Sequence, residues 1–175
     1  MAGRTSPSRH RIASRIALLY PGKEHSVIGE PEAGKGWFIL HLARDELLAG
    51  GRVLYVDFED DESTVVGRLH FELGVPAETR VERFSYVRPD GPGARYYSQL
   101  LEQVQPTLVI LDGVTEGYGL HGWVIEDNND TPKWRLAMVK PALRIGVATL
   151  STDHVVKTRG TETGSPSVVN TRKPD

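Results

Sequence analysis

The stretch from His25 to Ala43, HSVIGEPEAGKGWFILHLA, decides the expected fold. Within it, residues 29–35 read GEPEAGK and match the first seven positions of the phosphate-binding loop pattern G-x-x-x-x-G-K-[ST], known as Walker A. A short apolar run precedes the loop, and apolar residues at helical spacing follow it. Backbone N–H groups of such a loop converge on a phosphate, and the positive end of the following helix faces the same point. The stretch therefore predicts a nucleotide site between a strand and a helix.

The expected nucleotide-binding residues are Gly29, Glu30, Pro31, Glu32, Ala33, Gly34, Lys35, Gly36 and Trp37. We expect the ammonium group of Lys35 to reach the terminal phosphates. Gly36 stands where the pattern has a Ser or Thr hydroxyl that ligates Mg²⁺. Because Mg²⁺ keeps several waters in most such sites, a water can take this place, so we expect binding to be weakened rather than abolished. The alternative interpretation is a glycine-rich turn that holds no ligand.

Length and composition bound the class of protein. The 175 residues suit one domain, and 39% hydrophobic and 25% charged residues are ordinary for a globular chain. The net charge of −2 gives no overall electrostatic reason to expect nucleic acid as a partner. The absence of cysteine excludes disulfides and thiolate metal sites. No apolar run approaches the roughly 18 residues of a membrane span, and no secretion signal opens the chain, so we expect a cytoplasmic protein without a membrane partner.

Apolar runs alternate with helical patterns along the chain, which predicts an α/β fold with a parallel sheet covered by helices on both faces. The expected strands lie at residues 25–28, 52–58, 81–87, 107–112 and 147–150, the last running on into 151–154. The expected helices lie at residues 35–48, 63–73, 97–104 and 133–143. We interpret residues 115–130 as a long polar loop. Ligands of such sheets bind at the carboxyl ends of strands, so the polar residues there are the candidates for chemistry.

Three of those strand ends carry candidate catalytic or metal-binding residues. Asp112 closes the run LVIL and is the expected Mg²⁺ ligand, through waters of the ion. Glu59 closes VDFE and is the candidate to polarise the water that attacks the terminal phosphate, with Asp60 and Asp61 as alternatives. His154 follows the last strand and is the candidate to contact the terminal phosphate or that water.

These residues together resemble the RecA-like ATPases, and more narrowly the bacterial and phage AAA family ATPases similar to the hexameric RepA helicase. The matching segments are GEPEAGKGW at 29–37, GGRVLYVDFED at 50–60, LVILDGVTE at 108–116 with LHG at 120–122, and STDHVVK at 151–157. The resemblance implies a three-layer, RecA-type P-loop NTPase core that binds ATP and Mg²⁺. In that family Lys35 would contact the phosphates, Glu59 would be the catalytic carboxylate, Asp112 the magnesium-side acid and His154 the phosphate sensor.

The resemblance also sets expectations for domain organisation and partners. We expect a flexible basic arm at residues 1–15, an ATP-binding domain at 16–157 and a polar tail at 158–175. The family continues with further sheet strands, which this chain is expected to lack. Members are often oligomeric, as in a hexamer-like ring, and some act on single-stranded DNA in replication or recombination. The net charge of this chain does not support the DNA partner.

Two functions from different classes fit these observations. The first is an ATP-binding RecA-like domain with weak ATPase activity, linked to DNA replication or recombination. The second is a catalytically impaired relative that serves as an interaction or assembly subunit, which Gly36 and the early end of the sheet pattern favour. A small-molecule kinase is a third interpretation, although the chain shows no arginine-rich lid segment.

Overall fold

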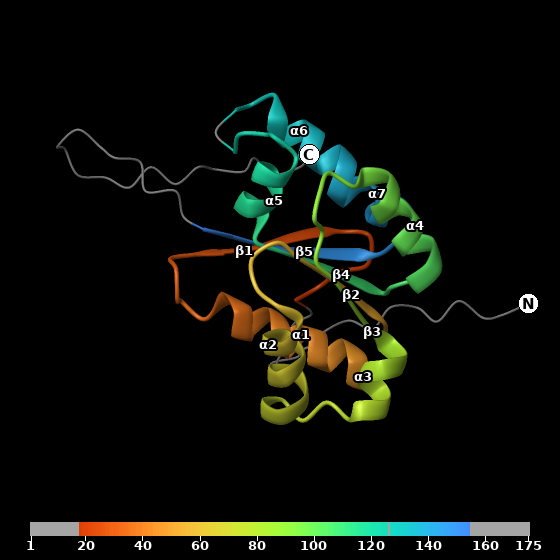
Figure 1. Cartoon of the computed structure of the whole chain (residues 1–175). Coiled ribbons are helices and arrows are strands. Elements are labelled where there is room, and N and C mark those ends of the chain that lie inside the picture. Colours follow the sequence, from red (N-terminus) through yellow and green to blue (C-terminus); the bar gives the residue numbers. More distant parts are fainter. Residues whose placement is uncertain (1–17, 126, 155–175) are drawn as a thin grey trace, which may run out of the picture.

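The computed structural model describes residues 18–125 and 127–154. It contains a five-stranded parallel sheet with the strand order β1-β5-β4-β2-β3 (Figure 1). The strands are β1 (Glu24–Gly29), β2 (Val53–Asp57), β3 (Phe84–Val87), β4 (Leu108–Asp112) and β5 (Ala148–His154). The expected basic arm at residues 1–15 and the polar tail at 158–175 lie outside the described residues. The predicted α/β fold with a parallel sheet is confirmed.

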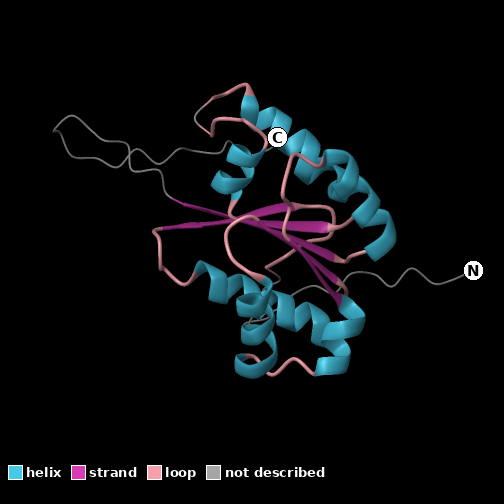
Figure 2. Ribbon diagram, in the orientation of Figure 1, coloured by secondary structure: helices cyan, strands magenta, loops and turns pink. Residues whose placement is uncertain are grey.

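Helices cover both faces of the sheet, which gives the three layers seen in Figure 2. On one face lie α1 (Lys35–Leu48), α2 (Glu62–Gly67), the π-helical turn η1 (Arg68–Glu72) and α3 (Ala77–Arg83). On the other lie α4 (Ala94–Val104), α5 (Val114–Leu120), α6 (Asp130–Trp134), the π-helical turn η2 (Arg135–Val139) and α7 (Lys140–Arg144). No helix among the described residues is both long and apolar enough to cross a membrane.

The central strands β2 and β4 are apolar at every position before their final aspartates, because both of their faces are buried. In β2, Val53 and Tyr55 pack into the core beneath α1, whereas Leu54 and Val56 pack into the core beneath α4. Successive side chains of a strand point to opposite faces, so a continuous apolar run supplies both cores at once. β4 repeats this division between the same two cores. The runs in these two strands therefore fix the middle of the sheet.

The first strand lies at an edge of the described sheet. β1 pairs with β5 in parallel, from Glu24 opposite Thr149 to Gly29 opposite His154. Its side chains alternate between exposed and partly buried, and Ile28 is 51% exposed. This partial burial explains why the strand carries a shorter apolar run than β2 or β4.

Most predicted elements occur with small shifts of their ends, but three predictions were wrong in part. Residues 81–83, expected in a strand, are the last turn of α3, which begins after Pro76 and leaves only four residues for β3. The expected loop at 115–130 contains most of α5, because Val114, Gly117 and Tyr118 recur at helical spacing and are buried. The helix expected from residue 133 begins at Asp130.

That last helical segment also changes its winding along its length. It passes from α6 through the π-helical turn η2 into α7. Pro141 lies in the first turn of α7. Proline has no N–H to donate to the preceding turn, so its place at the start of α7, directly after the π-helical turn, leaves the helix interior intact.

Candidate nucleotide site

The phosphate-binding loop leaves the edge strand β1 and leads directly into α1. Glu32 and Gly34 have φ values of 60° and 82°, which place both in the left-handed region. The N–H of Ala33 donates to the carbonyl of Glu30 at 3.2 Å, which closes the turn. Gly34 is the N-cap of α1, and no side chain caps the helix end. The N–H groups of the first turn and the positive dipole end of this 14-residue helix therefore face the loop.

Lys35 lies inside the curve of this loop. Its ammonium donates to the carbonyl oxygens of Gly29 at 2.9 Å and Glu30 at 3.0 Å. These contacts fold the side chain back over the loop, so the positive charge sits where the loop and the helix end converge. The structure thus places the Lys35 ammonium against the backbone of the loop, at the start of α1.

The first turn of α1 has room for the side chain that the pattern calls for and this chain lacks. A Cβ atom added at Gly36 would meet no heavy atom within 4 Å. The adjacent Trp37 is 41% exposed, and the guanidinium of Arg68 lies 5.4 Å from its ring centroid. Trp37 therefore packs toward the segment of α2 and η1, at the border of the loop.

Asp112 ends β4 at the same edge of the sheet. Its carboxylate accepts hydrogen bonds from the hydroxyl groups of Tyr55 and Thr152. Burial raises the pKa of Asp112 above its ordinary value, and the carboxylates of Asp57 and Asp60 add to this, while the two hydroxyl donors oppose it. Burial also raises the pKa of Tyr55, so its hydroxyl keeps its proton and can donate. Asp112 is thus held in place by side chains of the two neighbouring strands.

Three acidic residues at or just after the end of β2 have hydrogen-bond or ion-pair partners that fix their positions. Asp57 is buried and accepts from the N–H groups of Glu59 and Asp60, each at 2.9 Å, and from the Tyr86 hydroxyl at 3.0 Å. Asp61 caps α2 by accepting from the N–H of Thr64 at 3.1 Å, and hydrogen bonds lower its pKa to about 2. Asp60 lies 3.6 Å from Arg68.

Glu59 lies next to the end of β4. The N–H of Phe58 donates to the carbonyl of Asp112 at 3.0 Å, which continues the β2–β4 pairing beyond the strands. A Cβ added at Gly113 would lie 2.9 Å from the Cβ of Glu59 and 3.1 Å from a carboxylate oxygen of Glu116. Gly113, with φ of 77°, therefore lets the Cβ of Glu59 and the carboxylate of Glu116 approach the end of β4 closely. Glu59 therefore lies beside Gly113, the residue that follows Asp112.

β5 lies between the phosphate loop strand and the Asp112 strand. Register places Leu111 opposite Ser151 and Val27 opposite Thr152. Neighbouring strands are about 4.8 Å apart, so the backbones of β1 and β4 are separated by about 10 Å. The backbone of His154 pairs with Gly29 at the start of the loop, and its side chain lies outside the described structure.

The residues at this edge fit a magnesium ion that is held mainly by phosphate oxygens and water. Asp112 offers a hard carboxylate oxygen, and the open space at Gly36 leaves room for a water. Within residues 18–125 and 127–154, no three His, Asp or Glu side chains form a metal cage. Mg²⁺ does not require one, since it usually binds through one or two carboxylates together with substrate phosphates.

Two residues at this edge were missed by the sequence reasoning. Thr152 donates to Asp112 and accepts from the N–H of Gly113 at 3.0 Å, so it connects β5 to the end of β4. Tyr55 holds the other side of the carboxylate. A hydroxyl at the carboxyl end of the last strand was the available signal for Thr152. Tyr55 lies inside an apolar run and carried no such signal.

Comparison with known proteins gives one family match. A family model described as an AAA domain matches residues 2–160, which is most of the chain. A search of curated proteins finds no match.

Proposed function

Because the chain belongs to the AAA domain family, a group of P-loop nucleotide-binding proteins, we propose that it is a RecA-like domain that binds ATP with Mg²⁺ and hydrolyses it slowly. We assign this function to residues 16–157 and place it in DNA replication or recombination, in a helicase-like setting. The narrower likeness to the RepA group of bacteria and phages supports that setting.

One observation carries the proposal: the Lys35 ammonium binds the loop that follows β1, and Asp112 ends β4 at the same edge of the sheet. Lys35 sits within the loop, between the carbonyls of Gly29 and Glu30. Asp112 lies across β5, about two strand spacings away. A cation on one side and a metal-binding carboxylate on the other suit the terminal phosphates of ATP with their ion.

In this proposal, Glu59 orients and polarises a water for attack on the terminal phosphorus. The bond from that phosphorus to the bridging oxygen breaks, which releases ADP and inorganic phosphate. The proton of the water passes to Glu59 and then to the phosphate product or to solvent. Lys35 and the N–H groups at the start of α1 stabilise the charge that develops on the phosphate oxygens. When bound, Mg²⁺ supplies further charge stabilisation beside Asp112.

Calorimetric titration of the full chain with ATP in excess Mg²⁺ tests the binding step. We expect saturable binding that falls at least about tenfold in a Lys35→Ala variant, since a charge-assisted contact is worth about 1.5–3 kcal/mol. Lys140→Ala is the matched control, because Lys140 is an exposed lysine at the start of α7 on the opposite face. Equal affinity of all three proteins, or no binding at all, contradicts the proposal.

Hydrolysis is tested separately by phosphate release. We expect Glu59→Gln to keep ATP binding and lose most of the turnover, because the amide cannot accept a proton. The second candidate function, an assembly subunit that binds ATP without turnover, is favoured by Gly36 at the metal-ligand position. Turnover that depends on Glu59 eliminates this candidate, whereas binding without turnover supports it.

We extend the proposal to a homo-oligomer, in the form of a hexamer-like ring, with single-stranded DNA as a further partner. The family resemblance supports both, and the net charge of −2 gives the DNA partner no further support. Light scattering after size exclusion, with and without ATP and Mg²⁺, tests the oligomer. A fluorescent oligonucleotide titrated at low and moderate salt tests the DNA partner.

A further inference from the structure

Tyr86 in β3 donates a hydrogen bond toward the turn that carries Glu59. Its hydroxyl lies 3.0 Å from a carboxylate oxygen of Asp57, the last residue of β2, and 3.5 Å from the carbonyl oxygen of Asp60. The bond to Asp57 is the shorter of the two. Burial raises the pKa of Tyr86, and the charge of Asp57 adds to this, so the hydroxyl keeps its proton and can donate.

The carboxylate of Asp57 divides its two oxygens between Tyr86 and this turn. Oδ2 accepts from the Tyr86 hydroxyl, and Oδ1 accepts from the N–H groups of Glu59 and Asp60, each at 2.9 Å. Asp57 is 0% exposed, and a buried carboxylate requires such donors. The terminal torsion of an aspartate is broad, so a hydrogen bond at one oxygen decides where the other oxygen points. Tyr86 therefore acts on the backbone of Glu59 through Asp57.

The ring of Tyr86 is itself held in place by a neighbouring tyrosine. Tyr86 stands opposite Tyr55 in the β2–β3 pairing, and the two rings stack with their centroids 6.1 Å apart and an angle of 17° between their planes. The hydroxyl of Tyr55 donates to Asp112. The two stacked tyrosines therefore bind both acidic strand ends on this face of the sheet, since Tyr55 holds Asp112 and Tyr86 holds Asp57.

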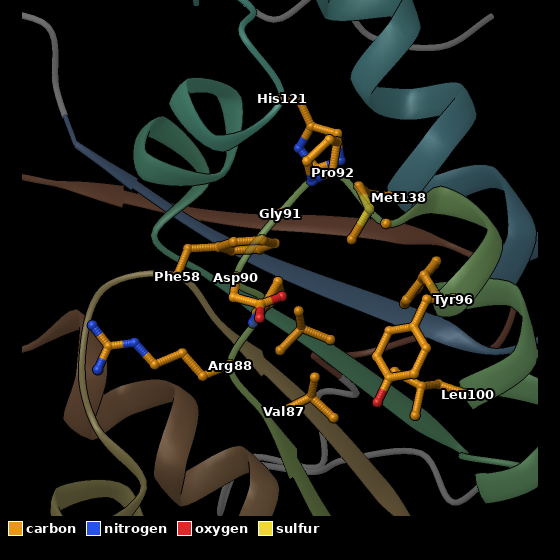
Figure 3. A pocket seen from close by; sticks show the side chains of 14 residues that line it. Phe58, Val87, Arg88, Asp90, Gly91, Pro92, Tyr96, Leu100, His121 and Met138 are labelled. Atoms are coloured by element: carbon orange, nitrogen blue, oxygen red, sulfur yellow. The ribbon is translucent and has the colours of Figure 1, made fainter.

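Phe58 anchors the start of the same turn from the opposite face of the sheet. Its ring packs on that of Trp134 with centroids 5.6 Å apart, and its N–H donates to the carbonyl of Asp112 at 3.0 Å. Figure 3 shows the Phe58 ring among the side chains that line a cavity of about 400 Å³ on that face. Apolar packing and strand pairing thus fix residue 58, whereas the next two residues bind Asp57 through their N–H groups.

We propose that Tyr86 is a positioning residue for the carboxylate of Glu59 and acts on it through Asp57. This inference rests on the proposed hydrolysis, in which Glu59 takes a proton from the attacking water. A small displacement of such a group slows the chemical step. ATP binding depends instead on the phosphate loop and Lys35. Loss of the Tyr86 hydroxyl therefore lowers turnover and leaves the affinity for ATP unchanged.

Tyr86→Phe tests this role, because it removes the hydroxyl and keeps the ring. A second variant, Asp57→Asn, leaves a single acceptor oxygen for the three donors that Asp57 binds. Tyr97→Phe is the matched control, since Tyr97 is a buried tyrosine of α4 whose hydroxyl has no partner within the described residues. The full chain of each variant is studied by NMR amide exchange, by calorimetric titration with ATP in excess Mg²⁺ and by phosphate release.

We expect the N–H groups of Glu59 and Asp60 to exchange at least about fivefold faster in both variants. The N–H of Thr64, which Asp61 holds, should exchange as in the native protein and is the internal reference. Turnover should fall at least about threefold in both variants, while the Kd of ATP stays within about twofold. Tyr97→Phe should change none of these quantities.

Unchanged exchange of the two N–H groups in Tyr86→Phe overturns the proposal, even if Asp57→Asn accelerates it. Faster exchange with unreduced turnover overturns it as well. So does a parallel loss of turnover and ATP affinity, which indicates a general loosening of the site. If the native chain binds ATP and releases no phosphate, the proposed hydrolysis fails and this role fails with it. Failure of this inference alone is recognised by native turnover that Tyr86→Phe leaves unchanged.

Discussion

Replacement of Gly36 by serine tests whether the nucleotide site lacks a single metal ligand. The position lies in the first turn of α1, and an added Cβ meets no heavy atom within 4 Å. A side chain therefore fits without movement of its neighbours. The serine hydroxyl would take the place of one water of the ion next to the phosphates.

Gly36→Ala is the matched control, because it gives the same Cβ and a similar helical benefit without a hydroxyl. Alanine stabilises a helix interior by about 0.5–1 kcal/mol relative to glycine. For a chain of this size that raises the melting temperature by about 1–4 °C. Serine gives a smaller rise, since its helix propensity is lower than that of alanine.

The affinity for Mg²⁺-ATP distinguishes Gly36→Ser from Gly36→Ala. If the exchange of water for hydroxyl gains about 0.5–1.5 kcal/mol, as a typical buried hydrogen bond does, the Kd of Mg²⁺-ATP falls about 2- to 13-fold in Gly36→Ser. The assay is calorimetric titration with ATP in excess Mg²⁺ and again in a chelator. We expect the serine variant alone to gain affinity, and only with Mg²⁺ present. Equal affinity of the alanine and serine variants refutes the assignment of position 36 to the metal.

Two further substitutions test the packing and the electrostatics. Gly117→Ala in α5 would place a Cβ 2.6 Å from an atom of the buried Trp134 ring, so we expect a loss of about 1–3 kcal/mol in the free energy of unfolding, measured by urea denaturation. Gly119→Ala, in the same helix with open space around it, should show no such loss. Asp112→Asn tests the buried carboxylate, whose pKa is raised in the folded state, chiefly by burial. Because its pKa is raised, Asp112 binds its proton more tightly in the folded state than in the unfolded state. The protonated carboxyl therefore adds its full contribution to the stability of the fold when the pH is below the ordinary pKa of 3.8. This contribution is lost as the pH rises through the folded-state pKa. We therefore expect the amide variant to melt at a higher temperature than the native protein at neutral pH and to show a flatter stability profile above pH 4, recorded by thermal melts across pH. Asp90→Asn at an exposed site should leave the profile unchanged, and the same flattening in that variant argues against the role of burial.

Local sequence was sufficient to predict the elements whose signals are local. The predicted helix at 35–48 coincides with α1, because its apolar spacing begins after the loop glycines and ends at Gly50 and Gly51. The runs that form β2 and β4 could be recognised because both faces are buried, which requires apolar side chains at successive positions. Helix α3 and the start of β3 could not be separated, since Val81 reads as a strand residue yet is 71% exposed on a helix.

In the candidate site, too, local sequence identifies some residues, and only the fold brings the others together. Lys35, Asp112 and Glu59 were predicted from the loop pattern and from acidic residues at strand ends, because parallel strands bring their carboxyl ends to one edge. Thr152 and Tyr55 were not, because their contact with Asp112 depends on which strands are neighbours.

The sequence by itself determined the phosphate loop, the helix that follows it and the apolar strands of a parallel sheet, because each is encoded by residues adjacent in the chain. Only the tertiary structure decided that β5, the last strand, inserts between β1 and β4 and sets the backbones of these two strands about 10 Å apart. Strand order results from how helices pack on the two faces of the sheet, and no local pattern specifies it.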